Sequence, residues 1–169
     1  MTQVVTLVPY NPEWEEMFNV DKMKLYGVLG NLFLEIEHVG STSIPGMCAK
    51  PIIDIAIAVN DFSVIDEVVI EELTRVGYEY VPKKDFPQRK FFRRGQWGAG
   101  THHLHMFEKD SDEWVNMILF RNYLRTHSDV ANDYLLQKKQ LARKHERIAY
   151  TKHKAPFIEG IIKEARKKI

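Results

Sequence analysis

The feature that most constrains the fold of this chain is the stretch HVGSTSIPGMCAKPIIDIAI at residues 38–57, where two apolar segments flank a loop rich in Gly, Ser and Pro. The second apolar segment, residues 52–59, is typical of a central strand buried on both faces. It contains a single carboxylate, Asp54, with isoleucines on both sides. An ionised carboxylate in a buried strand is costly unless a metal ion, a cationic group or backbone amides pair with it. We therefore expect Asp54 to have a specific partner.

Periodicity and capping residues predict the other elements. Strands are expected at residues 2–8, 32–39, 52–59, 78–81, 89–94 and 103–108. Helices are expected at residues 11–29, 62–76, 111–125 and 130–145, and from Tyr150 or Pro156 to the end. Asn11 caps the first helix, whose buried side should include Trp14, Met17, Phe18, Met23, Leu25 and Leu29.

The order of these elements indicates a mixed α/β (α+β) fold. The Gly-rich residues 95–100 join two predicted strands as a hairpin, which favours a mixed, partly antiparallel sheet flanked by helices. We expect one domain over residues 1–169, with an α/β core of about residues 1–110 and a helical C-terminal part of about residues 111–169 packed on it.

Composition excludes several classes of protein. The net charge of +1 implies no global polyanion partner, so nucleic acid is not the expected ligand, although a local patch of positive charge could still bind it. The single cysteine, Cys48, rules out an intrachain disulfide and suits a reducing cytosol. The N-terminus resembles no signal peptide, and no apolar run approaches the roughly 20 residues of a membrane span. We expect a cytoplasmic protein without membrane contact, of unknown oligomeric state.

The loop at residues 40–50 is the first candidate for ligand binding. Gly40 allows a ligand to approach the backbone, and Ser41, Thr42 and Ser43 add hydroxyl groups. Converging amides in such a loop form an anion site suited to phosphate. The GxxxxGK[ST] spacing of a Walker loop is absent. The alternative is a tight turn between two strands.

Asp54 is a candidate ligand for a divalent metal that also meets a polyphosphate. The alternative is a structural acid paired with Lys50 or an arginine. Metal chemistry of this kind usually needs two carboxylates, whereas the next same-face position on the strand is Ala56.

The segment THHLHMFE places His103 and His105 on one face of a strand and His102 on the other. Two imidazoles on one face could form a metal pair or an acid/base pair. The alternative is a set of polar strand residues that face a helix or solvent.

The basic segment KKDFPQRKFFRR, residues 83–94, places Arg89 and Arg93 on one face of a strand, where they could bind phosphates. Its interleaved phenylalanines would also suit base stacking and RNA binding. The alternative is a charged edge strand. If the C-terminal helices fold back on the sheet, Arg121 or Lys138 could reach the same ligand.

With these segments in place, the chain resembles the GrpB-like family of the nucleotidyltransferase superfamily. The resemblance covers nearly the whole chain and rests on VPYNPEW, EHVGSTSIPGMCAKPIIDI, RKFFRR, HHLH, FRNYLR and YTKHKAPFI. It implies a nucleotidyltransferase-like α/β core with a helical C-terminal part. In that superfamily a Gly-Ser turn cradles nucleotide phosphates, and an Asp-x-Asp/Glu pair holds magnesium. Gly40, Ser41 and Asp54 match this pattern, whereas Ala56 departs from it.

The prediction from sequence is a metal-dependent nucleotidyltransferase-like enzyme that binds a nucleoside triphosphate or related phosphate ligand. Asp54, His103 and His105 would hold a divalent metal, expected to be magnesium, and take part in catalysis. The phosphate-binding residues would be Gly40, Ser41, Thr42, Ser43, Lys50, Arg89 and Arg93. The alternative is a non-catalytic nucleotide- or phosphate-binding module that lost the second acid at position 56.

Overall fold

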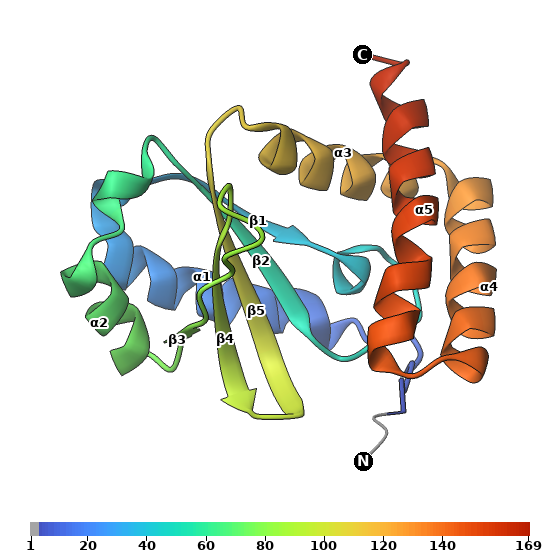
Figure 1. The fold of residues 1–169 in the computed structure, drawn as a ribbon, viewed down its shortest axis with the longest axis horizontal. Coiled ribbons are helices and arrows are strands. Elements are labelled where there is room, and N and C mark those ends of the chain that lie inside the picture. Colours follow the sequence, from blue (N-terminus) through green and yellow to red (C-terminus); the bar gives the residue numbers. More distant parts are fainter. Residues whose placement is uncertain (1–3) are drawn as a thin grey trace.

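A mixed β-sheet runs through the molecule, and the structure, a computed structural model, describes residues 4–169 (Figure 1). The strands lie in the order β1-β2-β5-β4-β3. Strands β2 and β5 are parallel, and the other three pairings are antiparallel. The strand bounds are β1 Phe33–Val39, β2 Ile53–Val59, β3 Glu79–Tyr80, β4 Lys90–Gln96 and β5 Ala99–Glu108. The predicted mixed, partly antiparallel sheet is confirmed, as is the hairpin formed by β4 and β5.

Helices cover both faces of this sheet (Figure 1). Their bounds are α1 Glu13–Leu29, α2 Glu67–Arg75, α3 Asp112–Thr126, α4 Ser128–Lys144 and α5 Arg147–Arg166. Helices α1 and α2 pack on one face and α3 packs on the other. Helices α4 and α5 pack against α3 at the same side of the molecule. None of the helices in residues 4–169 combines the length and hydropathy needed to cross a bilayer.

Helix α1 buries a stripe with a spacing of three to four residues. Asn11 Oδ1 accepts a hydrogen bond from the Glu13 amide at 2.9 Å, so the predicted start of the helix is confirmed. The buried stripe consists of Trp14, Phe18, Asp21, Leu25 and Leu29. The prediction that Met17 and Met23 are buried is wrong, because they lie off this stripe and are 36% and 70% exposed.

The predicted helix at residues 62–76 is two elements, a 3-10 turn Phe62–Val64 followed by α2. Each element has its own cap. The Asp61 carboxylate accepts from the Ser63 amide at 2.7 Å, and the Asp66 carboxylate accepts from the Val69 amide at 3.0 Å. Two acidic caps so close together interrupt what the apolar spacing alone predicts as one helix.

The predicted strand at residues 2–8 is in part outside the described residues. Of the remainder, only Val8 pairs, through a single bridge to Ala49 in which both amides donate, at 2.9 and 3.1 Å. Residues 4–7 form no strand, so the prediction is wrong for them. In the C-terminal part, the Ser111 hydroxyl caps α3 as predicted, and α5 begins at Arg147, earlier than either predicted start, with Pro156 inside it.

Alternation along β2 and β5 separates an apolar face from a face that carries polar side chains. On β2, four side chains enter the core under α1 and α2, namely Ile53, Ile55, Ile57 and Val59. Asp54 and His103, which are paired in register, point to the opposite face, where α3 packs, as does His105 two residues further along β5. The prediction that His103 and His105 share a face is therefore confirmed.

Candidate metal and phosphate site

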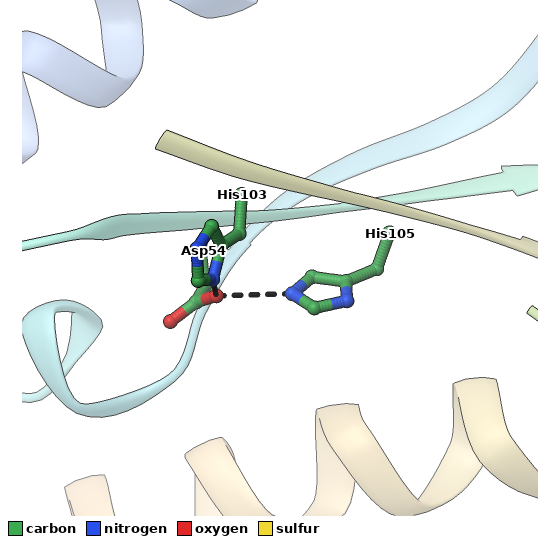
Figure 2. A group of neighbouring side chains, drawn as sticks. All are labelled: Asp54, His103 and His105. Atoms are coloured by element: carbon green, nitrogen blue, oxygen red, sulfur yellow. Dashed lines mark hydrogen bonds and ion pairs between the residues drawn. The ribbon is translucent and has the colours of Figure 1, made fainter. Parts of the chain in front are cut away.

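Two parallel strands bring one carboxylate and two imidazoles together. The register of β2 and β5 pairs Asp54 with His103, and pairs Ala56 with His105. His105 Nε2 lies 2.9 Å from Asp54 Oδ1, and His103 Nδ1 lies 3.5 Å from the same oxygen (Figure 2). One ligand atom from each of the three residues lies within 4.8 Å of the others. The neighbouring strand thus places an imidazole beside the position where the second acid is missing.

These separations fit a shared metal ion. Two ligands that each lie about 2.1 Å from a metal, at angles between tetrahedral and octahedral, are about 3.0–3.4 Å apart. The two distances from Asp54 Oδ1, 2.9 and 3.5 Å, are close to this range. His105 Nδ1 is buried without a hydrogen-bond partner among the described residues. The triad could therefore hold a metal ion through one atom of each residue.

The charges of the triad also suit a cation. Burial alone would raise the pKa of Asp54, but hydrogen bonds from His103 and His105 outweigh it and hold that pKa well below its usual range. Burial lowers the pKa of His105, against the opposing attraction of Asp54. At neutral pH Asp54 is thus an ionised carboxylate beside a neutral His105, the protonation states that metal ligands require.

The Gly40 turn closes tightly over Asp54. Gly40 has φ +71°, and a Cβ atom built there would lie 2.6 Å from Asp54 Oδ2. Only glycine therefore combines this backbone conformation with the close approach to the carboxylate. The turn continues into a 3-10 turn, Ser41–Ser43, and Gly40, Ser41 and Thr42 line the same cavity as Asp54, His103 and His105. Gly40 and Asp54, which both match the nucleotidyltransferase pattern, therefore lie in direct proximity.

A cavity of about 640 Å³ opens at the triad. Asp54, His103 and His105 line it together with residues from the Gly40 turn, α3, α4 and α5. The cavity is lined by two carboxylates, Asp54 and Glu113, and by five basic side chains. The basic residues are Lys50, Arg89, Lys138, Arg147 and Lys154. In a chain with a net charge of +1, this is a local excess of positive charge. The cavity is therefore suited to an anionic ligand.

Most of the predicted phosphate-binding residues line this cavity. They are Gly40, Ser41, Thr42, Lys50 and Arg89. Arg89 Nε is buried and has no hydrogen-bond partner within residues 4–169. The Thr42 hydroxyl is already engaged, because it lies 3.0 Å from His38 Nε2 and donates to the Ile52 carbonyl at 3.2 Å.

Ser43 and Arg93 are placed elsewhere. The Ser43 hydroxyl donates to the Gly40 carbonyl at 2.6 Å, and Ser43 lines a separate cavity of about 610 Å³ beside α1 and α3. Arg93 is on the expected face of β4, but its guanidinium lies 3.9 Å from the Trp97 ring centroid and donates to the Gly95 carbonyl at 2.9 Å. Neither side chain lines the 640 Å³ cavity.

The C-terminal helices contribute more than the sequence predicted. Lys138 reaches the cavity from α4, as expected if the tail folds back. Arg121 instead donates to Glu37 and to the His38 carbonyl, at 2.5 and 3.0 Å. Arg147 and Lys154 on α5 were not predicted. Lys154 lies in the segment YTKHKAPFI and Arg147 lies just before it, and the periodicity of this region does not say which side of α5 faces the sheet.

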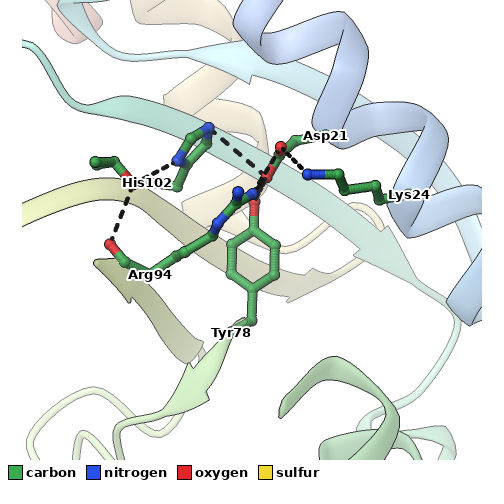
Figure 3. Close-up of polar contacts among 6 residues, drawn as sticks. Asp21, Lys24, Tyr78, Arg94 and His102 are labelled. Carbon is green, nitrogen blue, oxygen red and sulfur yellow. Dashed lines mark hydrogen bonds and ion pairs between the residues drawn. The ribbon is translucent and has the colours of Figure 1, made fainter. Parts of the chain in front are cut away.

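A second polar cluster lies on the opposite face of the sheet, between α1, β4 and β5 (Figure 3). The Asp21 carboxylate accepts from Arg94 Nη1 at 2.8 and 2.6 Å and from the Tyr78 hydroxyl, and His102 Nε2 lies 3.6 Å away. Neither described cavity is lined by these residues. The cluster therefore joins α1 to the sheet, and Arg94 Nη1 is engaged by Asp21 rather than by the cavity at Asp54.

The chain matches the sequence profile of a known family, described as GrpB protein, over residues 4–164. The chain belongs to the GrpB family. The crystal structure of the conserved protein GrpB from Enterococcus faecalis superposes with a TM-score of 0.88 at 37% identity, covering 96% of this chain and 98% of that one. The UPF0157 protein BH1888 of Halalkalibacterium halodurans is 36% identical over 165 residues, covering 95% of this chain and 82% of BH1888.

Another relative is longer than this GrpB-family chain. The UPF0157 protein YqkA of Bacillus subtilis (strain 168) is 38% identical over 141 residues, which cover 83% of this chain and 40% of YqkA. The chain thus spans less than half the length of that relative.

More distant structures show the class of fold. The Cid1 poly(U) polymerase superposes with a TM-score of 0.53 at 11% identity, and a cytoplasmic RNA terminal U-transferase superposes with 0.52 at 14%. The alignments cover 80% and 78% of this chain, and 44% and 40% of the two enzymes. The GrpB-family chain therefore has a nucleotidyltransferase-like fold, as predicted.

Proposed function

We infer that this GrpB-family protein is a metal-dependent nucleotidyltransferase-like enzyme that binds a nucleoside triphosphate or a related phosphate compound. The observation that carries the proposal is the convergence of Asp54, His103 and His105 on one cavity, next to the Gly40 turn. The fold supports the same class, because its polymerase neighbours include one crystallised with MgGTP bound. Fold alone does not assign a reaction, so the proposal depends on the site.

The ligand set favours particular metals. Mg²⁺ prefers oxygen ligands in near-octahedral geometry, whereas imidazole suits Zn²⁺ and other transition metals. A site with one carboxylate and two imidazoles should therefore prefer Mn²⁺ or Zn²⁺ to Mg²⁺. The expectation of magnesium stays a prediction, and a comparison of the metals tests it directly.

The chain's own groups would position the phosphate. The peptide groups at Gly40 and Ser41 border the cavity, where a phosphate oxygen can accept from backbone amides. Lys50 and Arg89 line the same cavity and would neutralise negative charge that develops on the transferred group. A metal bound by the triad would act as a Lewis acid on the phosphoryl oxygens. These roles match a transfer in which positioning and charge stabilisation do most of the work.

A non-catalytic phosphate-binding module is the second candidate, and Ala56 favours it. Ala56 is fully buried and packs with Val39, Phe107 and Trp114, so the position of the second acid is filled by core packing. A chain that lost one metal-binding acid could keep the cavity and bind a ligand without turnover.

Labelled nucleoside triphosphates, incubated with a pool of small hydroxyl, amine and phosphate acceptors in Mn²⁺, Zn²⁺ or Mg²⁺, separate the two candidates. The enzyme predicts metal-dependent pyrophosphate release and label transfer, both abolished by Asp54→Asn. The matched control is Asp133→Asn, which changes an exposed acid on α4 and should keep full activity. Saturable binding without turnover identifies the binding module. Unchanged nucleotide and metal affinity in Asp54→Asn contradicts the enzyme.

A further inference from the structure

Four basic side chains from three parts of the fold line the 640 Å³ cavity. Lys50 lies in the loop before β2, Lys138 lies on α4, and Arg147 and Lys154 lie on α5. We call these four residues the basic cluster. None of them belongs to the Asp54 triad, and three of the four come from the C-terminal helices that pack beside the sheet (Figure 1).

Contacts with one tyrosine ring show that Lys50 and Lys154 lie close together, and Lys138 contacts a second tyrosine of the cavity. The Nζ atoms of Lys50 and Lys154 are 5.0 and 5.1 Å from the centroid of the same ring, that of Tyr150. Lys138 Nζ is 5.4 Å from the centroid of Tyr134, which also lines the cavity. Aromatic faces attract these ammonium groups but leave their charges uncancelled.

The lysines of the basic cluster are buried to different degrees and lack acidic partners. Lys138 is 2% exposed, and its Nζ donates to the Cys48 carbonyl at 2.6 Å. Among residues 4–169, no carboxylate makes an ion pair with Lys50, Lys138 or Lys154. Buried charges are ordinarily paired, so this arrangement indicates a ligand that supplies the missing negative charge.

Mutual repulsion among the positive charges of the basic cluster also indicates an anionic ligand. Burial, followed by the charges of Lys154 and Lys50, lowers the pKa of Lys138 to about 7. Burial, followed by the charges of Lys154 and Arg147, lowers the pKa of Lys50 to about 8. An anion bound among these groups would relieve both effects.

We propose that the basic cluster is a binding subsite for adjacent phosphate groups, as in a linear polyphosphate chain, and that it works without the metal triad. The three lysines without a carboxylate partner carry more positive charge than one carboxylate or one orthophosphate would neutralise, whereas linked phosphates present several negative charges within a few ångströms. The subsite deepens the proposed function and rests on it for the identity of the complete ligand. The phosphate chain would enter from α4 and α5, and its reacting end would face Asp54.

Calorimetry with sodium tripolyphosphate in EDTA tests the subsite without any metal. The wild-type protein should bind tripolyphosphate saturably and at least about tenfold more tightly than orthophosphate. Lys154→Met should weaken tripolyphosphate binding by about tenfold or more, because a charged hydrogen bond is lost. The matched control, Lys152→Met, changes an exposed lysine on the same helix and should bind like the wild type. Circular dichroism and melting temperature confirm that each variant is folded.

Asp54→Asn separates the subsite from the proposed function. This variant should keep tripolyphosphate binding in EDTA, since it removes a negative charge from the cavity and leaves the basic cluster intact. The subsite is overturned if the wild type shows no saturable tripolyphosphate binding, if orthophosphate binds equally well, or if Lys154→Met binds like Lys152→Met. The proposed function can fail on its own, through metal binding that Asp54→Asn does not change, while the subsite stands.

Discussion

Replacing Asp21 with asparagine should destabilise the protein strongly, although this residue does not line the cavity of the candidate site. Asp21 is 2% exposed and lies in the buried stripe of α1. Its carboxylate accepts two hydrogen bonds from Arg94 and one from the Tyr78 hydroxyl. Asparagine has nearly the same shape, so the variant removes the charge without creating a cavity.

The loss of unfolding free energy in Asp21→Asn depends on how exposed its partner, Arg94, is. Breaking a buried ion pair by removing one charge costs about 3–5 kcal/mol. The Arg94 side chain is 29% exposed and regains some hydration, and the asparagine oxygen still accepts one hydrogen bond. We therefore expect a loss of about 2–3 kcal/mol at pH 7. For a chain of this size, that corresponds to a fall in melting temperature of about 4–12 °C.

Urea unfolding and thermal melting of Asp21→Asn and the wild type provide the measurement. The control is Asp112→Asn, which breaks the exposed ion pair with Arg166 and should change stability little. Hydrogen bonds from Tyr78 and Arg94 overcome burial and lower the pKa of Asp21 from its ordinary 3.8. The stabilisation is therefore complete above about pH 4 and is lost as pH falls through the folded-state pKa. Equal effects of Asp21→Asn and Asp112→Asn at pH 7 would refute the reasoning.

Three other outcomes follow from the structure. Gly40→Ala should abolish metal binding in calorimetry, because its methyl group would collide with Asp54 Oδ2. The control Gly27→Ala in α1, where nothing lies within 4 Å, should bind metal normally. Equal metal binding by both variants contradicts the role of the Gly40 turn. Gly27→Ala should also raise stability, by about 0.5–1 kcal/mol in urea unfolding, and a loss would count against the open space seen there. Tripolyphosphate binding at pH 8 should be accompanied by proton uptake, because a bound anion raises the lowered pKa values of Lys50 and Lys138. Calorimetry in buffers of different ionisation enthalpy measures the number of protons taken up. Net proton release would contradict the prediction.

Local sequence rules predicted the part of the site that lies on strands. Alternation along a strand fixes the face of each side chain, so His103 and His105 could be assigned to one face without knowing their neighbours. The resemblance to the nucleotidyltransferase pattern likewise grouped Gly40 with Asp54. What alternation did not specify was the pairing of β2 with β5, which sets His103 beside Asp54 and His105 beside Ala56.

The contributions of the C-terminal helices depend on packing that no local pattern encodes. Arg147 and Lys154 reach the cavity because α5 packs beside α3 and α4, and an amphipathic period does not specify which neighbours a helix will have. Asp21 was missed for a related reason. It occupies an apolar stripe as a charged residue, and its tertiary contacts with Arg94 and Tyr78 make that position favourable.

The most direct test of the account is a titration of the protein with Mn²⁺, with free Mn²⁺ followed by electron paramagnetic resonance. The account predicts one bound ion per chain, with binding lost in Asp54→Asn, weakened in His105→Ala and unchanged in Asp133→Asn. Absence of saturable Mn²⁺ binding to the folded wild type, or equal binding by wild type and Asp54→Asn, would contradict the assignment of Asp54, His103 and His105 as a metal centre.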